Sequence, residues 1–324
     1  MHIYIITFIL SFALTYIVRK IAIKKSIIDT PNERSSHTVP TPRGGGLAIA
    51  ITWFIGLIYL FINNRIESNL FYALLSGIIL VIISFLDDIY NLNPKIRIIA
   101  QLISASLALY FLGGMKIIDI GFYKLENIWL LTPVALIGII WFINLYNFLD
   151  GIDGYAGMEA IFISLAFYFF SNHSFYLLLT FSVLGFLVWN WQPAKIFMGD
   201  VGSTLLGFNF AVLAIYEQNT LSVSIIIFLI ISSIFWFDAT YTLFRRWKNK
   251  EKLSQAHRKH AYQRIVQAGF SHQKTVFFAT FLNIINFVFA YMSFQNKNLC
   301  TVYFIFTLII VFGITYLIDK KKSF

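Results

Sequence analysis

Eleven apolar runs, separated by polar links, set the strongest limit on how this 324-residue chain folds. A helix needs about 20 residues to cross the roughly 30 Å of bilayer hydrocarbon, and most of the runs approach that length. They lack the two-residue alternation of barrel strands, so we expect α-helices. The predicted spans are residues 2–18, 45–63, 69–86, 96–112, 128–143, 157–171, 174–190, 202–216, 220–241, 274–294 and 300–318.

The composition supports a membrane location for the whole chain. Hydrophobic residues make up 58% and charged residues 12%, against roughly 45–50% and about 25% in soluble domains. The first run lacks the leading basic residues and the cleavage site of a signal peptide, so we expect a retained span. The sequence therefore predicts an all-α, polytopic membrane bundle in which residues 1–324 form one transmembrane domain.

Basic residues are distributed unevenly over the polar links. Of the 25 Lys and Arg residues, 21 fall on alternate links, above all on 19–44 and 242–274. Because basic links stay cytoplasmic, this side faces the cytoplasm and the N-terminus lies outside. The net charge of +10 suits anionic membrane lipids or an anionic substrate, although orientation alone explains the count equally well. No nucleic-acid partner is expected.

Carboxylates gather where spans meet this basic side, which is costly and usually reflects function. Asp87 and Asp88 end the third span, and adjacent helical residues point about 100° apart. One acid can then face the bundle and the other the next link. The alternative is that both solvate a helix end, but acids at a helix C-terminus oppose the macrodipole.

The stretch NLYNFLDGIDGYAG repeats polar residues with a period of three: Asn144, Asn147, Asp150 and Asp153. Amide and carboxylate oxygens suit Mg²⁺ together with phosphate oxygens. The alternative is a polar turn with helix caps, for example Asp153 before the sixth span.

Asp200 lies between two glycines in MGDVGSTLLG, at the start of the eighth span. The flanking Gly199 and Gly202 permit a bend and bring backbone N–H groups to an anion. Asp200 could simply cap the helix. If Ser203 takes the cap instead, Asp200 is free to bind a metal.

Two basic segments complete the candidate site. In PTPRGGG, Arg43 supplies charge, and Gly44 and Gly45 could wrap a phosphate with backbone amides; a flexible entry loop is equally compatible. In the second segment, HRKHAYQR, the neighbouring cations disfavour zinc and favour a diphosphate or a sugar, while the alternative is a surface helix against headgroups. Its candidate binding residues are His257, Arg258, His260 and Arg264.

Five motifs in order carry a resemblance that covers almost the whole chain: DTPNERSSHTVPTPRGGGLAI, FLDDIYNLNPKIR, NLYNFLDGIDGYAG, FMGDVGSTLLGF and the His/Arg segment. In these motifs the chain resembles the polyprenyl-phosphate N-acetylhexosamine-1-phosphate transferases. The resemblance implies a bacterial inner-membrane enzyme with one transmembrane transferase domain. The implied reaction moves an N-acetylhexosamine 1-phosphate from a UDP-sugar to undecaprenyl phosphate and releases UMP, with Mg²⁺ or alternatively Mn²⁺ as cofactor.

The resemblance also implies roles for single residues. Asp200 would be a principal metal ligand with Asn147 beside it. Asp87 would act on the lipid phosphate as a base or an electrostatic guide, and Asp88 would support the metal and phosphate region. Asp153 would contact the uracil.

The remaining matched residues would bind the substrates. Arg43 would lie near the lipid phosphate, and the His/Arg segment would bind the diphosphate and the sugar. The wider set of implied substrate-binding residues is Asn144, Asp150, Gly44, Gly45, His257, Arg258, His260 and Arg264.

The last motif departs from the three consecutive histidines of peptidoglycan translocases. It resembles O-antigen initiators that use UDP-N-acetylfucosamine or UDP-N-acetylquinovosamine, and UDP-N-acetylglucosamine stays open. Two alternatives remain from the sequence: a transporter, disfavoured because the acids cluster at one face, and a lipid-diphosphate hydrolase that transfers to water.

Overall fold

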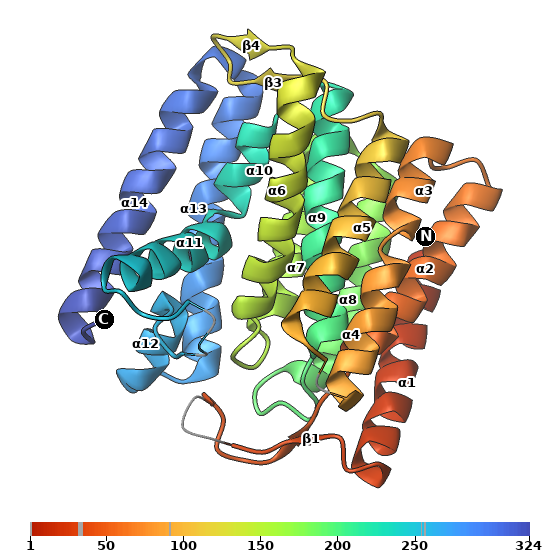
Figure 1. Cartoon of the computed structure of the whole chain (residues 1–324), viewed down its shortest axis with the longest axis vertical. Coiled ribbons are helices and arrows are strands. Elements are labelled where there is room, and N and C mark those ends of the chain that lie inside the picture. Colours follow the sequence, from red (N-terminus) through yellow and green to blue (C-terminus); the bar gives the residue numbers. More distant parts are fainter. Residues whose placement is uncertain (1, 32–34, 91, 254, 256) are drawn as a thin grey trace.

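The computed structural model describes residues 2–31, 35–90, 92–253, 255 and 257–324. Residues 32–34 and 91, which belong to two of the quoted motifs, lie outside these ranges. The fold is an all-α bundle, as predicted (Figure 1). The helices are α1 (His2–Lys24), α2 (Gly46–Ile62), α3 (Ser68–Leu75), α4 (Ile78–Tyr90), α5 (Pro94–Leu112), α6 (Ile128–Phe148), α7 (Tyr155–Ser171), α8 (Ser174–Asn190), α9 (Asp200–Asn219), α10 (Ile225–Ile231), α11 (Ser233–Lys248), α12 (Ala261–Gln267), α13 (His272–Gln295) and α14 (Cys300–Lys321), with a 3₁₀ turn at Lys297–Leu299.

Strands are limited to two small antiparallel hairpins in the described chain. Strand β1 (Ile28–Asp29) pairs with β2 (Thr41–Pro42), and β3 (Ile118–Asp119) pairs with β4 (Lys124–Leu125). Figure 1 places the β1 hairpin at one end of the bundle, near α12 and the links before α7 and α9, and the β3–β4 hairpin at the other. The links predicted to be cytoplasmic therefore share one end.

The helices account for most of the predicted spans. Six stretches are long and apolar enough to cross a bilayer, or seven if a bent pair is counted. Three further apolar helices, α2, α7 and α8, have 17 residues each. The chain is thus a multi-pass membrane protein, while the count of eleven and the outward N-terminus stay predictions.

The ninth predicted span, residues 220–241, is wrong as a single helix. The chain forms α10 and α11, which meet at a bend of 79°. Ser232 leaves helical geometry at the junction (φ −90°, ψ 10°). A run of apolar residues predicts that the segment lies in lipid, but it does not predict a bend of the helix within the run.

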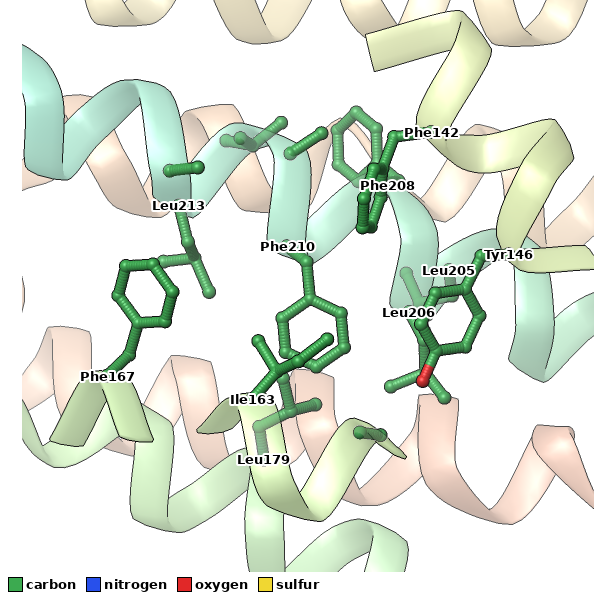
Figure 2. Packing of buried hydrophobic residues seen from close by; sticks show 14 of the residues in the cluster. Phe142, Tyr146, Ile163, Phe167, Leu179, Leu205, Leu206, Phe208, Phe210 and Leu213 are labelled. Carbon is green, nitrogen blue, oxygen red and sulfur yellow. The ribbon is translucent and has the colours of Figure 1, made fainter. Parts of the chain in front are cut away.

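Helix α9 is the centre of the bundle. Every residue from Val201 to Gln218 is buried, and α9 contacts α2, α3, α4, α5, α6, α7 and α10. Figure 2 shows Leu205, Leu206, Phe208, Phe210 and Leu213 of α9 packed among side chains of α6, α7 and α8. Lipid is as apolar as these side chains, so close packing stabilises the helix contacts more than burial from water does.

The closest approach to α9 is made by α2, glycine against glycine. A Cβ atom on Gly46 would lie 2.2 Å from the nitrogen and 2.4 Å from the Cα of Gly202. Such distances are below any real carbon contact, so both glycines are needed for the helices to touch. Gly202 therefore serves helix packing, and the predicted role in presenting amides to an anion finds no support.

Substituting Gly46 by Ala is expected to separate α2 from α9 and to lower the free energy of unfolding by about 1–3 kcal/mol. The measurement is the midpoint of thermal unfolding in detergent. The matched control is Gly138→Ala in α6, where an added Cβ meets nothing within 4 Å and helix propensity favours Ala. Equal midpoints for the two variants would contradict the close contact.

A partly buried histidine–glutamate pair joins the link between α7 and α8 to α9 at the other end of the bundle. His173, which precedes α8, has its Nδ1 atom 2.9 Å from Oε1 of the fully buried Glu217. The Tyr176 hydroxyl donates to the same oxygen. The hydrogen bond to Glu217 raises the pKa of His173, and burial opposes it less strongly.

A raised folded-state pKa makes the stability from His173 depend on pH. The contribution is fully present below the unfolded value of about 6.5 and is lost as the pH rises through the folded-state pKa. We expect His173→Gln to lower the thermal midpoint most near about pH 6 and progressively less toward about pH 9. A midpoint difference that is constant over this range would contradict the pair.

Candidate functional site

A polar cavity of about 390 Å³ opens at the end of the bundle that carries the β1 hairpin. It collects residues from links that are far apart in the sequence, including five carboxylates, three histidines and an arginine. Its lining includes Asp29, Ser35, Ser36, His37, Arg43, Asp88, Asn147, Asp150, Asp153, Asn190, Phe197, Gly199, Asp200, His257, Gln263 and His272.

Backbone hydrogen bonds join the glycine segment to the link before α9. Phe197 N–H donates to Pro42 O (2.8 Å), Gly45 N–H to Phe197 O (2.9 Å) and Gly46 N–H to Met198 O (2.8 Å). The Gly45 amide is therefore already bonded and does not serve a phosphate as we predicted. Gly44 has φ +101°, and an added Cβ would meet nothing within 4 Å.

Gly199 allows the backbone to pass close to Asp88. With φ +76° and ψ 174°, it adopts a conformation that favours glycine, and an added Cβ would lie 3.0 Å from Asp88 Oδ2. That oxygen is buried and has no hydrogen-bond partner among the residues that the structure describes. Arg43 donates to the Asp88 backbone carbonyl (2.8 Å), and its Nε lies 3.8 Å from Asp88 Oδ1.

Arg97, which the sequence analysis did not select, links two of the predicted catalytic acids. Its Nη1 atom lies 3.1 Å from Asp87 Oδ2 and 3.3 Å from Asp200 Oδ2. Asn93 caps α5 and Pro94 begins it, so Arg97 lies in the first turn and faces α4 and α9. The available signal in the sequence is a basic residue nine positions after the double acid, in the same motif.

The cap of α9 differs from the prediction. Gly199 occupies the N-cap without a side-chain cap. The Ser203 hydroxyl donates instead to Asn147 Oδ1 (2.7 Å), so the expectation that Ser203 caps the helix is wrong. Asp200 begins α9 and lines the cavity, and Ser203 fixes the amide of its predicted partner Asn147.

A second cavity of about 320 Å³ adjoins the first, and Asn147 and Asp200 line both. Its wall is largely apolar, with one guanidinium, one carboxylate and three amides, two of which form a hydrogen-bonded pair. Asn144 and Gln101 form that pair, with Asn144 Nδ2 donating to Gln101 Oε1 (2.7 Å). The second cavity is lined by Leu80, Ile83, Ser84, Pro94, Arg97, Ile98, Ala100, Gln101, Asn144, Asn147, Phe148, Asp200, Thr204 and Leu253.

The link between α6 and α7 carries Asp150 and Asp153 into the first cavity. Burial, and then the charges of Asp200, Asp88 and Asp153, raise the pKa of Asp150 to about 7. Asp153 does not cap α7; Gly154 (φ +75°) does. Asp153 Oδ2 accepts the Ala194 amide (3.1 Å), and Oδ1 lies 3.3 Å from His272 Nδ1.

The His/Arg segment divides between the cavity and the scaffold. His257 lines the cavity, and burial, followed by the nearby His260 and Arg246, lowers its pKa to about 3, so it is neutral near pH 7. His260, at the start of α12, is 2% exposed. Its Nδ1 atom lies 3.6 Å from Asp238 Oδ1.

The two predicted arginines of this segment do not line the first cavity. Arg264 is 2% exposed and bonds to Asp319 and the Lys259 carbonyl. Arg258 donates to Ser35 O at 3.4 Å. Arg264 thus holds the loop to α14, and Arg258 holds it to the link after β1.

Oxygen donors around the first cavity suit a hard divalent cation, although no three His, Cys, Asp or Glu side chains of the described residues form a ready-made cluster. Within the described part of the chain, Asp88 offers a buried oxygen with no hydrogen-bond partner. Burial, and then the charges of the neighbouring carboxylates, raise the pKa of Asp150. A bound Mg²⁺ would relieve both, with carboxylate and amide oxygens as ligands. The donor chemistry therefore fits the ion.

The sequence of this chain is similar to those of known proteins. A family model described as glycosyl transferase family 4 matches residues 70–218. A probable undecaprenyl-phosphate N-acetylglucosaminyl 1-phosphate transferase of Bacillus subtilis is 31% identical, over 98% of this chain and 92% of its own length.

Two further relatives carry related names. An undecaprenyl-phosphate alpha-N-acetylglucosaminyl 1-phosphate transferase of Yersinia pestis is 29% identical over 82% of this chain and 77% of its own length. A decaprenyl-phosphate N-acetylglucosaminephosphotransferase of Mycobacterium tuberculosis is 27% identical over 83% of this chain and 76% of its own length. The chain belongs to glycosyl transferase family 4, the polyprenyl-phosphate N-acetylhexosamine-1-phosphate transferases.

Proposed function

We propose that the protein transfers an N-acetylhexosamine 1-phosphate from a UDP-sugar to undecaprenyl phosphate and releases UMP. One observation carries the proposal: a polar cavity and a largely apolar cavity meet at Asn147 and Asp200. A soluble, anionic donor fits the first cavity. A phosphate on an apolar chain fits the second, where Arg97 lies beside Asp87 and Asp200.

In the proposed reaction, an oxygen of the lipid phosphate forms a bond to the β-phosphorus of the donor. The bond from that phosphorus to the bridging oxygen breaks, and UMP leaves with the electron pair. A phosphate monoester has a second pKa near about 6, so the attacking oxygen is largely ionised near neutral pH. Asp87 then orients Arg97 and the lipid phosphate, and it removes a proton only from the singly ionised phosphate that becomes abundant below about pH 6.

The chain's own residues hold the two substrates in line. Arg97 attracts the lipid phosphate, while Arg43 stabilises Asp88 next to the Gly199 turn. On the donor side, neutral His257 and Asp153 line the first cavity. Positioning and electrostatic stabilisation account for most catalysis in phosphoryl transfer.

Asp200, Asn147 and Asp88 would hold Mg²⁺, with Mn²⁺ as the alternative. When bound, such an ion neutralises the charge that develops on the diphosphate. Ser203 holds the Asn147 amide by donating to its oxygen, which fixes that side chain at the junction of the cavities.

The relatives' names favour N-acetylglucosamine in the donor. UDP-N-acetylglucosamine is therefore the first candidate, and UDP-N-acetylfucosamine and UDP-N-acetylquinovosamine come next. The bacterial inner membrane supplies the acceptor, and the lipid-linked product would begin an O-antigen or another envelope polysaccharide.

The purified protein, given Mg²⁺, undecaprenyl phosphate and radiolabelled UDP-N-acetylglucosamine, is expected to produce lipid-soluble label and free UMP. The same assay with the two deoxysugar nucleotides identifies the preferred donor. A hydrolase would instead release UMP or phosphate without the acceptor, and a transporter would move label without cleavage. Absence of acceptor-dependent label with all three donors would reject the proposal.

Asp200→Asn is expected to lower kcat at least about 100-fold, because it removes a charge at the junction of both cavities. Asp87→Asn is expected to cost less, and its loss to shrink as the pH rises above the second pKa of the lipid phosphate, about 6. The control is Glu126→Gln, an exposed acid at the other end of the bundle. If Asp87→Asn and Asp200→Asn lose the same activity at every pH, Asp87 has no separate role at the lipid phosphate.

A further inference from the structure

His272 occupies a place that none of the proposed roles uses. It is the first residue of α13, is 8% exposed and lines the first cavity. Its ring lies between two walls of that cavity that come from distant parts of the chain. One wall is the link after β1, with Ser35, Ser36 and His37, and the other carries Asp153.

Both ring nitrogens have partners. Nε2 lies 3.1 Å from the Ser36 carbonyl oxygen, which only accepts, so Nε2 carries a hydrogen. Nδ1 lies 3.3 Å from the Asp153 amide nitrogen and 3.3 Å from Asp153 Oδ1. A neutral ring accepts from the amide, and a charged ring donates to the carboxylate, so either form holds Asp153.

Each segment that His272 joins also has contacts of its own, from Arg258 to Ser35 O and from the Gly154 amide to Asn190 Oδ1. The Asp153 link lies between Gly151 and Gly154, and Gly154 has a positive φ. The Asp153 carboxylate has one other hydrogen bond, from Ala194, among the described residues. The opposite wall begins at a hairpin with strands of only two residues. The His272 ring adds a direct link from one segment to the other, across the cavity between them.

We propose that His272 is a positioning residue for the nucleotide part of the donor. By bonding to Asp153 and to Ser36, it sets the distance between the two walls that enclose the nucleotide. The inference rests on the proposed function for the identity of the donor. The link between the walls is a property of the chain and is tested separately.

Three substitutions separate the two bonds. His272→Ala removes both. In His272→Asn, the short amide reaches the position of Nδ1 and can form a hydrogen bond with Asp153 only. In His272→Gln, the longer amide reaches the position of Nε2 and can donate a hydrogen bond to the Ser36 carbonyl oxygen only. Lys274→Ala, an exposed position in the same turn of α13, is the matched control.

The first measurement is steady-state kinetics with UDP-N-acetylglucosamine, or with the donor that the panel identifies. We expect His272→Ala to raise the donor KM about tenfold with kcat within about threefold, because binding loses its preformed walls. His272→Asn should recover part of this KM, and Lys274→Ala should match the parent. An unchanged KM in His272→Ala, or a fall in kcat alone, would overturn the positioning role.

The second measurement is amide hydrogen exchange of residues 35–43 in the protein without donor. Exchange should be faster in His272→Ala and His272→Asn, and close to the parent in His272→Gln. Parent-like exchange in His272→Ala would overturn the link between the walls.

If the parent transfers no sugar to lipid, the proposed function fails, while this experiment still decides whether His272 joins the two walls. If His272→Ala does not fold, the Asn and Gln variants carry the comparison.

Discussion

The site depends on how closely α2 approaches α9. Gly46 and Gly202 let the two backbones touch, and three backbone hydrogen bonds then join residues 42–46 to the link at 197–198. This contact fixes the turn at Gly199, and the turn places Asp200 beside Asp88. Without the glycines, side chains would separate the helices, and the acids would not share one cavity.

Electrostatics explains why the acids tolerate one another. Asp87 and Asp200 share Arg97, Asp88 has Arg43, and Asp153 has His272. The compensation is incomplete, because Asp88 keeps an oxygen without a hydrogen-bond partner among the described residues, and burial together with the neighbouring carboxylates raises the pKa of Asp150 to about 7. Residual negative charge in a partly buried cavity favours a divalent cation, and with it an anionic substrate.

Local patterns predicted the positions of the acids better than the identity of their partners. The motif spacing selected Asp88, Asn147, Asp150, Asp153 and Asp200, and all five line the first cavity. It also selected Arg264, whose bonds to Asp319 and Lys259 make it part of the scaffold. It missed Arg97 and His272, since a lone basic residue near a helix start looks the same in the sequence whether it faces solvent or a cavity.

The sequence by itself determined the class of the fold, the end of the bundle at which the candidate site residues gather, and the family. Hydropathy, charge asymmetry and motif order are properties of the chain that do not depend on how its helices pack. The tertiary structure decided where the run at 220–241 bends, which amides are already bonded, and that Asn144 and Asp153 line different cavities. These outcomes depend on which hydrogen-bond donor lies next to which acceptor on a neighbouring helix. Only the packing of segments that are distant in the sequence decides that.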